Sequence, residues 1–157
     1  QGLKDANRSL RTLARGLVPM QIDAHGLIDA LTQLAAQISD QHGVACRFVA
    51  VEDIDVHDNG AATHLYRMTQ EAVNNALKHA APSTIVIRIQ RNDGMICLEI
   101  EDDGRGIDAP RPVAGRGLQI MAYRAGLIGG ILTVRRGTPG GTIVSCALSR
   151  LNLTEST

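Results

Sequence analysis

The middle of the sequence carries two runs of alternating residues that meet at a tight-turn signal. Isoleucine or leucine occupies every second position, at Ile85, Ile87 and Ile89 and again at Ile96, Leu98 and Ile100, and the triplet Asn92-Asp93-Gly94 lies between the two runs. Period-two alternation predicts strands that bury one face, and the triplet predicts an antiparallel hairpin. Hairpins in place of regular crossovers favour a mixed sheet covered by helices on one face, which is an α+β sandwich, over a doubly wound sheet.

The rest of the chain supplies further helices and strands around this hairpin. The spacing of apolar residues predicts helices over 3–17, 23–41, 61–80 and 118–128, and strands over 44–51, 131–135 and 142–148. Asp23 is expected to cap the second helix and Gly43 to end it. The order of elements predicts a two-layer sandwich, in which helices cover one face of a mixed, mostly antiparallel sheet.

Composition limits what the chain can bind. Sixteen Lys and Arg residues balance sixteen Asp and Glu residues, so no net field attracts nucleic acid or an anionic membrane. The aromatic content of 2% leaves no stacking platform for single-stranded nucleic acid. The three cysteines lie far apart in apolar runs, which indicates buried thiols rather than a disulfide framework or a zinc site. Any anionic ligand must therefore be held by local groups.

One face of the predicted 61–80 helix gathers polar groups of several kinds. An advance of about 100° per residue brings together Glu71, Asn74, Asn75, Lys78 and His79. Carboxylate and carboxamide oxygens suit Mg²⁺, while ammonium and imidazole groups suit phosphate oxygens. Taken alone, the stripe is also compatible with an ordinary solvated helix face.

Two glycine-containing segments give the stripe a context. Asp102 ends a predicted strand and is followed by Gly104 and Gly106, where glycine allows the backbone to approach a ligand closely. The free N–H groups and positive dipole end of a helix start favour phosphate, and a predicted helix opens with Gly115-Arg116-Gly117-Leu118. Each motif alone is weak evidence for a ligand site, and the order in which they follow one another along the chain makes them informative.

These elements resemble those of a known superfamily. Together with Gly140-Gly141-Thr142, they resemble the N, G1, G2 and final Gly-Thr elements of the GHKL ATPases, which include DNA gyrase, heat-shock chaperone ATPases, histidine kinases and mismatch-repair ATPases. Within that superfamily, residues 66–79 and 117–130 are similar to NarX/DegS/DesK-like sensor histidine kinases. Residues 10–31 resemble the end of the dimerisation and phosphoacceptor region of that group. The resemblance implies a Bergerat-type sandwich over 21–150, a partial dimerisation helix at 1–20 and a polar tail at 151–157.

The resemblance also implies a ligand, Mg-ATP, and a role for each site residue. Asn75 would coordinate Mg²⁺, and Glu71, the catalytic candidate, would orient a water or contribute to the metal shell. Lys78 and His79 would face the phosphates. Asp102 would accept a hydrogen bond from the adenine amino group. The remaining expected contacts shape the pocket and its lid: Gly104, Gly106, Ile107, Gly115, Gly117, Leu118 and Thr142.

The implied reaction transfers the γ-phosphoryl group of ATP to a histidine. In that group the acceptor lies on an earlier helix in a His-Asp context. The one His-Asp pair of this chain, His57-Asp58, falls in the predicted loop 52–60 and not on such a helix. The acceptor helix is therefore expected upstream of this chain, as are the sensor segment and any inner-membrane anchor. The expected partners are a response-regulator receiver domain and a second copy in a homodimer, and the expected location of this part is the cytoplasm.

Two other functions stay open at the level of sequence. One is a non-catalytic regulatory module that uses the pocket for nucleotide or for nothing, and the intact set of polar and glycine residues argues against it. The other is an anti-sigma-factor-type serine kinase of the same superfamily. Residues 11–31 argue against that function, because they resemble a kinase dimerisation helix.

Overall fold

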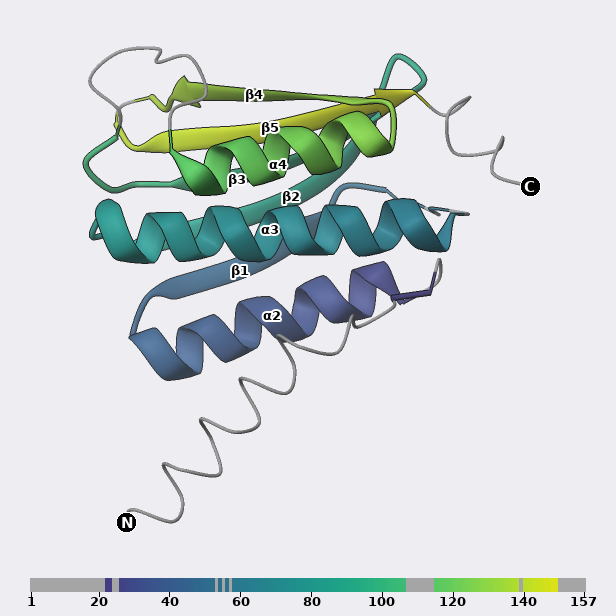
Figure 1. The fold of residues 1–157 in the computed structure, drawn as a ribbon. Helices are drawn as coiled ribbons and strands as arrows, with labels where there is room; N and C mark the ends of the chain where they lie inside the picture. Colours follow the sequence, from purple (N-terminus) through teal and green to yellow (C-terminus); the bar gives the residue numbers. More distant parts are fainter. Residues whose placement is uncertain are drawn as a thin grey trace, which may run out of the picture.

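The computed structural model describes residues 22–23, 26–52, 54, 56, 58–106, 115–138 and 140–149. The helix predicted over 3–17 lies outside these residues. Within them the elements run in the order α2 (Leu27–His42), β1 (Ala45–Ala50), α3 (Asn59–His79), β2 (Thr84–Asn92), β3 (Met95–Asp102), α4 (Arg116–Leu127), β4 (Gly130–Arg136) and β5 (Thr142–Ser149). Figure 1 shows α2, α3 and α4 side by side on one face of the sheet.

The five strands form one sheet in the order β1-β2-β3-β5-β4. Strands β1 and β2 are parallel, whereas the other three neighbouring pairs are antiparallel. The predicted fold class, a two-layer α+β sandwich with a mixed and mostly antiparallel sheet, is therefore confirmed. None of the helices in the described ranges has the length and apolar character needed to cross a membrane.

The predicted hairpin forms between β2 and β3. Ile87 pairs with Ile100 in its middle, and Asn92 pairs with Met95 next to the turn. The turn residues Asp93 and Gly94 have φ values of 50° and 78°, as a tight turn with left-handed central residues requires. The alternating isoleucines and leucines of both strands are buried on the helix side, as the period-two pattern predicts.

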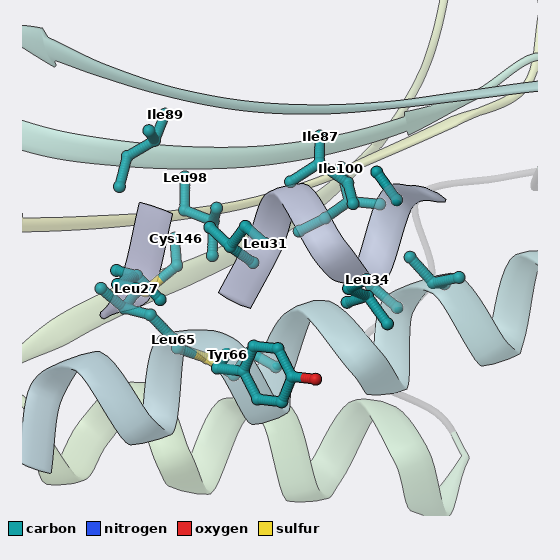
Figure 2. Packing of buried hydrophobic residues seen from close by; sticks show 14 of the residues in the cluster. Leu27, Leu31, Leu34, Leu65, Tyr66, Ile87, Ile89, Leu98, Ile100 and Cys146 are labelled. Atoms are coloured by element: carbon teal, nitrogen blue, oxygen red, sulfur yellow. The ribbon is translucent and has the colours of Figure 1, made fainter. Parts of the chain in front are cut away.

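The core lies between the helix layer and the sheet and is almost entirely aliphatic. Figure 2 shows residues of this core from α2, α3 and the sheet: Leu27, Leu31, Leu34, Leu65, Tyr66, Ile87, Ile89, Leu98, Ile100 and Cys146. Full burial of a Leu or Ile side chain contributes about 1.5–3 kcal/mol to stability. Burial raises the pKa of the Cys46 thiol to about 11 and that of Cys146 to about 12, so both remain neutral apolar groups of the core.

The structure corrects the expected starts of two helices. Asp23 does not cap α2: the N-cap is Gly26, which makes no side-chain cap bond, and the Gly26 amide donates to the backbone oxygen of Asp23. Asp23 lies three residues too early, because a cap side chain must reach the N–H groups that directly follow it. Helix α3 begins at Asn59, two residues before the predicted start. Its N-cap is Asp58, whose side chain accepts hydrogen bonds from the backbone N–H groups of Gly60 and Ala61 in the first turn. The predicted end of α2 at Gly43, which has a φ of 64°, is confirmed.

Asp103 ties the end of β3 to the start of β2. Its Oδ1 accepts from the N–H groups of Ser83 and Thr84, both at 2.8 Å, and its own N–H donates to the Thr84 oxygen. The Thr84 N–H, assisted by that of Ser83, lowers the pKa of the exposed Asp103 carboxyl. These bonds hold the segment between α3 and β2 against the end of β3, next to Asp102.

Replacing Asp103 with alanine removes this acceptor and should lower the free energy of unfolding by about 1 kcal/mol at neutral pH. Because the pKa of Asp103 is lower in the folded state, its contribution is present above the pKa of the unfolded carboxyl. That contribution is lost as the pH falls through the folded-state pKa, so wild type and variant should converge in acid. Urea denaturation at several pH values measures both effects.

The control is Asp40→Ala, which removes an exposed carboxylate from α2. It should change the free energy of unfolding by much less than the Asp103 variant does. If Asp103→Ala is as stable as wild type at pH 7, Asp103 does not hold the two strands together.

Candidate functional site

A cavity of about 270 Å³ lies between α3, the end of β3, the start of α4, and strands β4 and β5. Five polar residues line it: Asn75, His79, Asp102, Arg116 and Thr142. The remaining wall is made of small or apolar residues. Such a combination, a largely apolar hollow with a few placed polar groups, is typical of a small-molecule binding site.

The structure brings most of the predicted site residues to this cavity. The ones that line it are Asn75, His79, Asp102, Gly106, Gly115, Gly117, Leu118 and Thr142. Glu71, Lys78 and Gly104 are not part of its wall, and Lys78 is exposed on α3. Ile107 lies outside the described residues. The expected lid, residues 108–114, also lies outside them.

Asp102 is the buried acid of the site. It is 6% exposed, and its Oδ1 accepts from the Gly104 N–H at 2.9 Å. Burial raises the pKa of its carboxyl, and the backbone N–H groups of Gly104 and Thr142 oppose that rise. A carboxyl that is costly to ionise, lining a cavity, is a typical recognition or catalytic group.

The backbone around Asp102 is packed so closely that only glycine fits. Gly141 has a φ of +86°, and a Cβ there would overlap the backbone oxygen of Asp102. A Cβ at Gly104 would overlap the backbone of Ala80, whose oxygen also accepts from the Arg105 N–H at 2.9 Å. The loop after β3 is therefore pressed against the end of α3 on one side and the start of β5 on the other.

The first turn of α4 lies directly over the polar face of α3. A Cβ at Gly117 would overlap Oε1 of Glu71 and would lie 3.1 Å from Nδ2 of Asn75. Glu71 thus faces the backbone of α4, whereas Asn75, one turn later on α3, also reaches the cavity. Glycine at position 117 is what allows the two helices to come this close.

The two ends of the site lie at different points along α3. The Asp102 loop contacts α3 at Ala80, and α4 contacts it at Glu71 and Asn75. With a rise of about 1.5 Å per residue, Asn75 and Ala80 are about 7.5 Å apart along the helix axis. The site therefore has a buried acidic end at Asp102 and a second end at the start of α4, which offers a helix N-terminus and the cationic Arg116.

The oxygen atoms that the site offers fit a metal ion that enters together with a phosphate-bearing ligand. Among the described residues there is no cluster of three or more His, Cys, Asp or Glu side chains able to hold a metal. Asn75 offers one carboxamide oxygen at the cavity, and the Glu71 carboxylate lies one turn before it. Mg²⁺ usually takes only one or two protein ligands and completes its shell with water and phosphate oxygens.

Some wall residues were missed by the sequence analysis. Ala72, Ala76 and Ala80 face the cavity from α3, although their periodicity had placed them with the apolar core face. The available signal was their size, since three alanines at four-residue spacing leave room beside the helix. Val134 and Val144 form the apolar wall opposite, and the alternation along β4 and β5 could not distinguish a cavity wall from core.

Comparison with known proteins gives one family and several relatives. Residues 60–152 match the family described as histidine kinase-, DNA gyrase B-, and HSP90-like ATPase. The chain is 35% identical to the nitrate/nitrite sensor protein NarQ of Escherichia coli, in an alignment that covers 99% of this chain and 28% of that protein. It is 30% identical to the oxygen sensor histidine kinase NreB of Staphylococcus carnosus, over 87% of this chain and 40% of that one. The chain thus spans well under half the length of these relatives.

Solved structures give a matching picture. The histidine kinase domain of the blue-light activated histidine kinase from Erythrobacter litoralis EL346 aligns with a TM-score of 0.62 at 27% identity, covering 81% of this chain and 66% of that one. The ATP binding domain of PrrB from Mycobacterium tuberculosis aligns with a TM-score of 0.63 at 22% identity, covering 84% of this chain and 96% of that one. The second likeness concerns the fold alone.

Two adjacent glycines provide a test of the packing around Asp102. Gly141→Ala should lower the free energy of unfolding by roughly 2 kcal/mol or more, because a left-handed backbone and an overlap with the Asp102 oxygen both penalise a Cβ. Gly140→Ala is the matched control, because a Cβ at Gly140 meets nothing within 4 Å. Thermal and urea denaturation of both variants measure the difference, and equal stabilities would contradict this account of the packing.

Proposed function

Because the chain belongs to the family of histidine kinase-, DNA gyrase B- and HSP90-like ATPases, we propose that it is the ATP-binding catalytic domain of a two-component sensor histidine kinase. The observation that carries the proposal is the two-ended cavity, with a buried acid at one end and a helix N-terminus above Asn75 at the other. An adenine nucleotide has matching ends, an amino group on its base and a chain of phosphates.

Asp102 is the proposed adenine-binding residue. Its carboxyl lines the cavity beside Thr142, where its oxygens can accept a hydrogen bond from the exocyclic amino group of adenine. Guanine carries a carbonyl oxygen at the corresponding position, and two acceptors facing one another inside a buried pocket would leave both unsatisfied. The pocket should therefore prefer ATP to GTP. The valines of β4 and β5 supply the apolar wall against which the base packs.

The phosphates belong at the end formed by α3 and α4. Asn75 would hold a magnesium ion there through its carboxamide oxygen, and Glu71 would orient a water of the metal shell from one turn away. When bound, Mg²⁺ would neutralise negative charge on the phosphates. The free N–H groups of the first turn of α4 favour the phosphate oxygens, and His79 adds a polar group to the same cavity.

The proposed reaction is transfer of the γ-phosphoryl group to a histidine nitrogen. The bond from the γ-phosphorus to its bridging oxygen breaks as the bond to nitrogen forms, and ADP leaves. Catalysis of such a transfer rests on positioning and charge neutralisation. The acceptor histidine is proposed to lie on a helix upstream of this chain, because the one His-Asp pair here, His57-Asp58, lies directly before α3 and not on an earlier helix.

The names of the relatives support this proposal, since they describe sensor histidine kinases and nitrate, nitrite or oxygen sensors. For this chain we propose residues 21–150 as the catalytic domain, 1–20 as the end of the dimerisation region and 151–157 as a polar tail. A response-regulator aspartate would receive the phosphoryl group, and the full-length protein would be a homodimer. This domain would lie in the cytoplasm, and any inner-membrane anchor would belong to other segments.

Asp102→Asn tests the adenine end. Titration calorimetry with ATP analogue should show a loss of affinity of at least about tenfold, because a hydrogen bond to a charged group contributes about 1.5–3 kcal/mol. GTP analogue should bind wild type more weakly than ATP analogue does. Unchanged ATP affinity in the variant would refute the assignment of Asp102.

The fold of Asp102→Asn should stay intact, since the asparagine oxygen can still accept from the Gly104 N–H. Because burial raises the pKa of Asp102, wild type loses stability as the pH rises through that pKa, whereas the variant does not titrate there. The stability of the variant relative to wild type should therefore increase from acid to neutral pH. A stability loss at pH 7 would mean that the carboxylate supports the fold itself.

Asn75→Ala tests the metal end, with the neighbouring Asn74→Ala as its control. Asn74 is exposed and is not part of the cavity wall. In calorimetry, Asn75→Ala should reduce the gain in ATP affinity that Mg²⁺ provides by about tenfold, while its affinity for adenosine stays at the wild-type value. Asn74→Ala should behave as wild type, and equal Mg²⁺ effects in the two variants would exclude Asn75 as the metal ligand.

A further inference from the structure

Arg116 is a cation of the cavity wall to which the resemblance assigns no role. It is the first residue of α4, its side chain is exposed, and it lines the cavity together with its neighbours Gly115 and Gly117. Lys78, the cation expected at the phosphates, is also exposed but does not belong to that wall. Of these two positive side chains, the one placed at the cavity is therefore Arg116.

Nothing in the described part of the chain engages the Arg116 guanidinium. No hydrogen bond or ion pair joins it to another described residue, in contrast to other arginines of the chain. Arg88 pairs with Glu101, Arg135 pairs with Glu99, and Arg124 contacts His64. An arginine fork left available at a cavity wall has five N–H donors for an anionic ligand.

The surroundings of Arg116 also favour an anion. Helix α4 has Gly115 as its N-cap, with no side-chain cap bond and no acidic residue in its first turn. The N–H groups of that turn are therefore not satisfied by a side-chain cap, and the positive end of the helix dipole adds to the guanidinium charge. The acid of the cavity, Asp102, belongs to the other end, where the loop after β3 contacts α3 at Ala80.

We propose that Arg116 binds the outer phosphates of the nucleotide and gives the site its preference for a triphosphate over shorter ligands. This inference rests on the proposed function, because it assumes that an adenine nucleotide occupies the cavity with its base at Asp102. Arg116 directly precedes Gly117, whose backbone lies against Asn75, and both Arg116 and Asn75 line the cavity, so the two residues can serve the same phosphates from two helices. Arginine pairs with two phosphate oxygens at once, whereas lysine acts as a point charge.

The test compares Arg116→Ala with Arg47→Ala by titration calorimetry against ATP, ADP and adenosine at constant Mg²⁺. Arg47 is the matched control, since it is exposed on β1, at the opposite edge of the sheet from β4, and does not line the cavity. Arg116→Ala should lose about tenfold or more in ATP affinity, less for ADP and nothing for adenosine. The loss should shrink at high salt, because an exposed cation is screened. Arg116→Lys should recover only part of the ATP affinity.

The outcomes separate this inference from the function on which it rests. If wild type binds ATP, Asp102→Asn does not, and Arg116→Ala equals Arg47→Ala, the role of Arg116 is wrong and the function stands. If Arg116→Ala loses adenosine affinity as strongly as ATP affinity, the residue acts through the shape of the pocket, which also overturns the proposal. If wild type binds no adenine ligand, both the function and the inference fail.

Discussion

The site depends on backbone segments that approach one another more closely than side chains allow. At the end of β3, the Asp102 backbone touches Gly141, the residue just before the neighbouring strand β5, and the loop that follows β3 touches the end of α3 at Ala80. Three elements distant in sequence are joined there without intervening side chains. The close approach holds the Asp102 carboxyl at a fixed depth and removes it from water, which is what raises its pKa.

Helix α3 connects this site to the hydrophobic core, because one of its faces packs in the core and the other faces the cavity and α4. One face buries residues such as Leu65 and Met68 against the other helices and the sheet. The polar face carries Asn75 and His79 to the cavity, and Glu71 to the underside of α4. Any shift of the helix that disturbed core packing would also move these groups, so the geometry of the site follows from the stability of the fold.

Local patterns predicted most of the described fold, and many of the residues singled out as site candidates line the cavity. The hairpin could be predicted because period-two alternation and a turn triplet lie within 16 residues of one another, from 85 to 100. The Asp103 contacts could not, because they join positions 19 and 20 residues apart through a single side chain. The Asp58 cap was missed because it lies in an acidic stretch that resembles a loop, and the cavity alanines were missed because small apolar residues look like core.

The two ends of the cavity differ in how they are built, and the difference suits the proposed chemistry. The end at Asp102 is buried and is fixed by backbone contacts, so it can discriminate a base by fixed hydrogen bonds at the cost of keeping a carboxyl away from water. The end at α4 presents exposed groups, Gly115 and the Arg116 side chain. In the proposed reaction the base is not transferred and can be enclosed, whereas the phosphoryl group would have to meet the acceptor proposed to lie upstream of this chain. A closed end for recognition and an open end for transfer therefore satisfy both requirements within a single cavity.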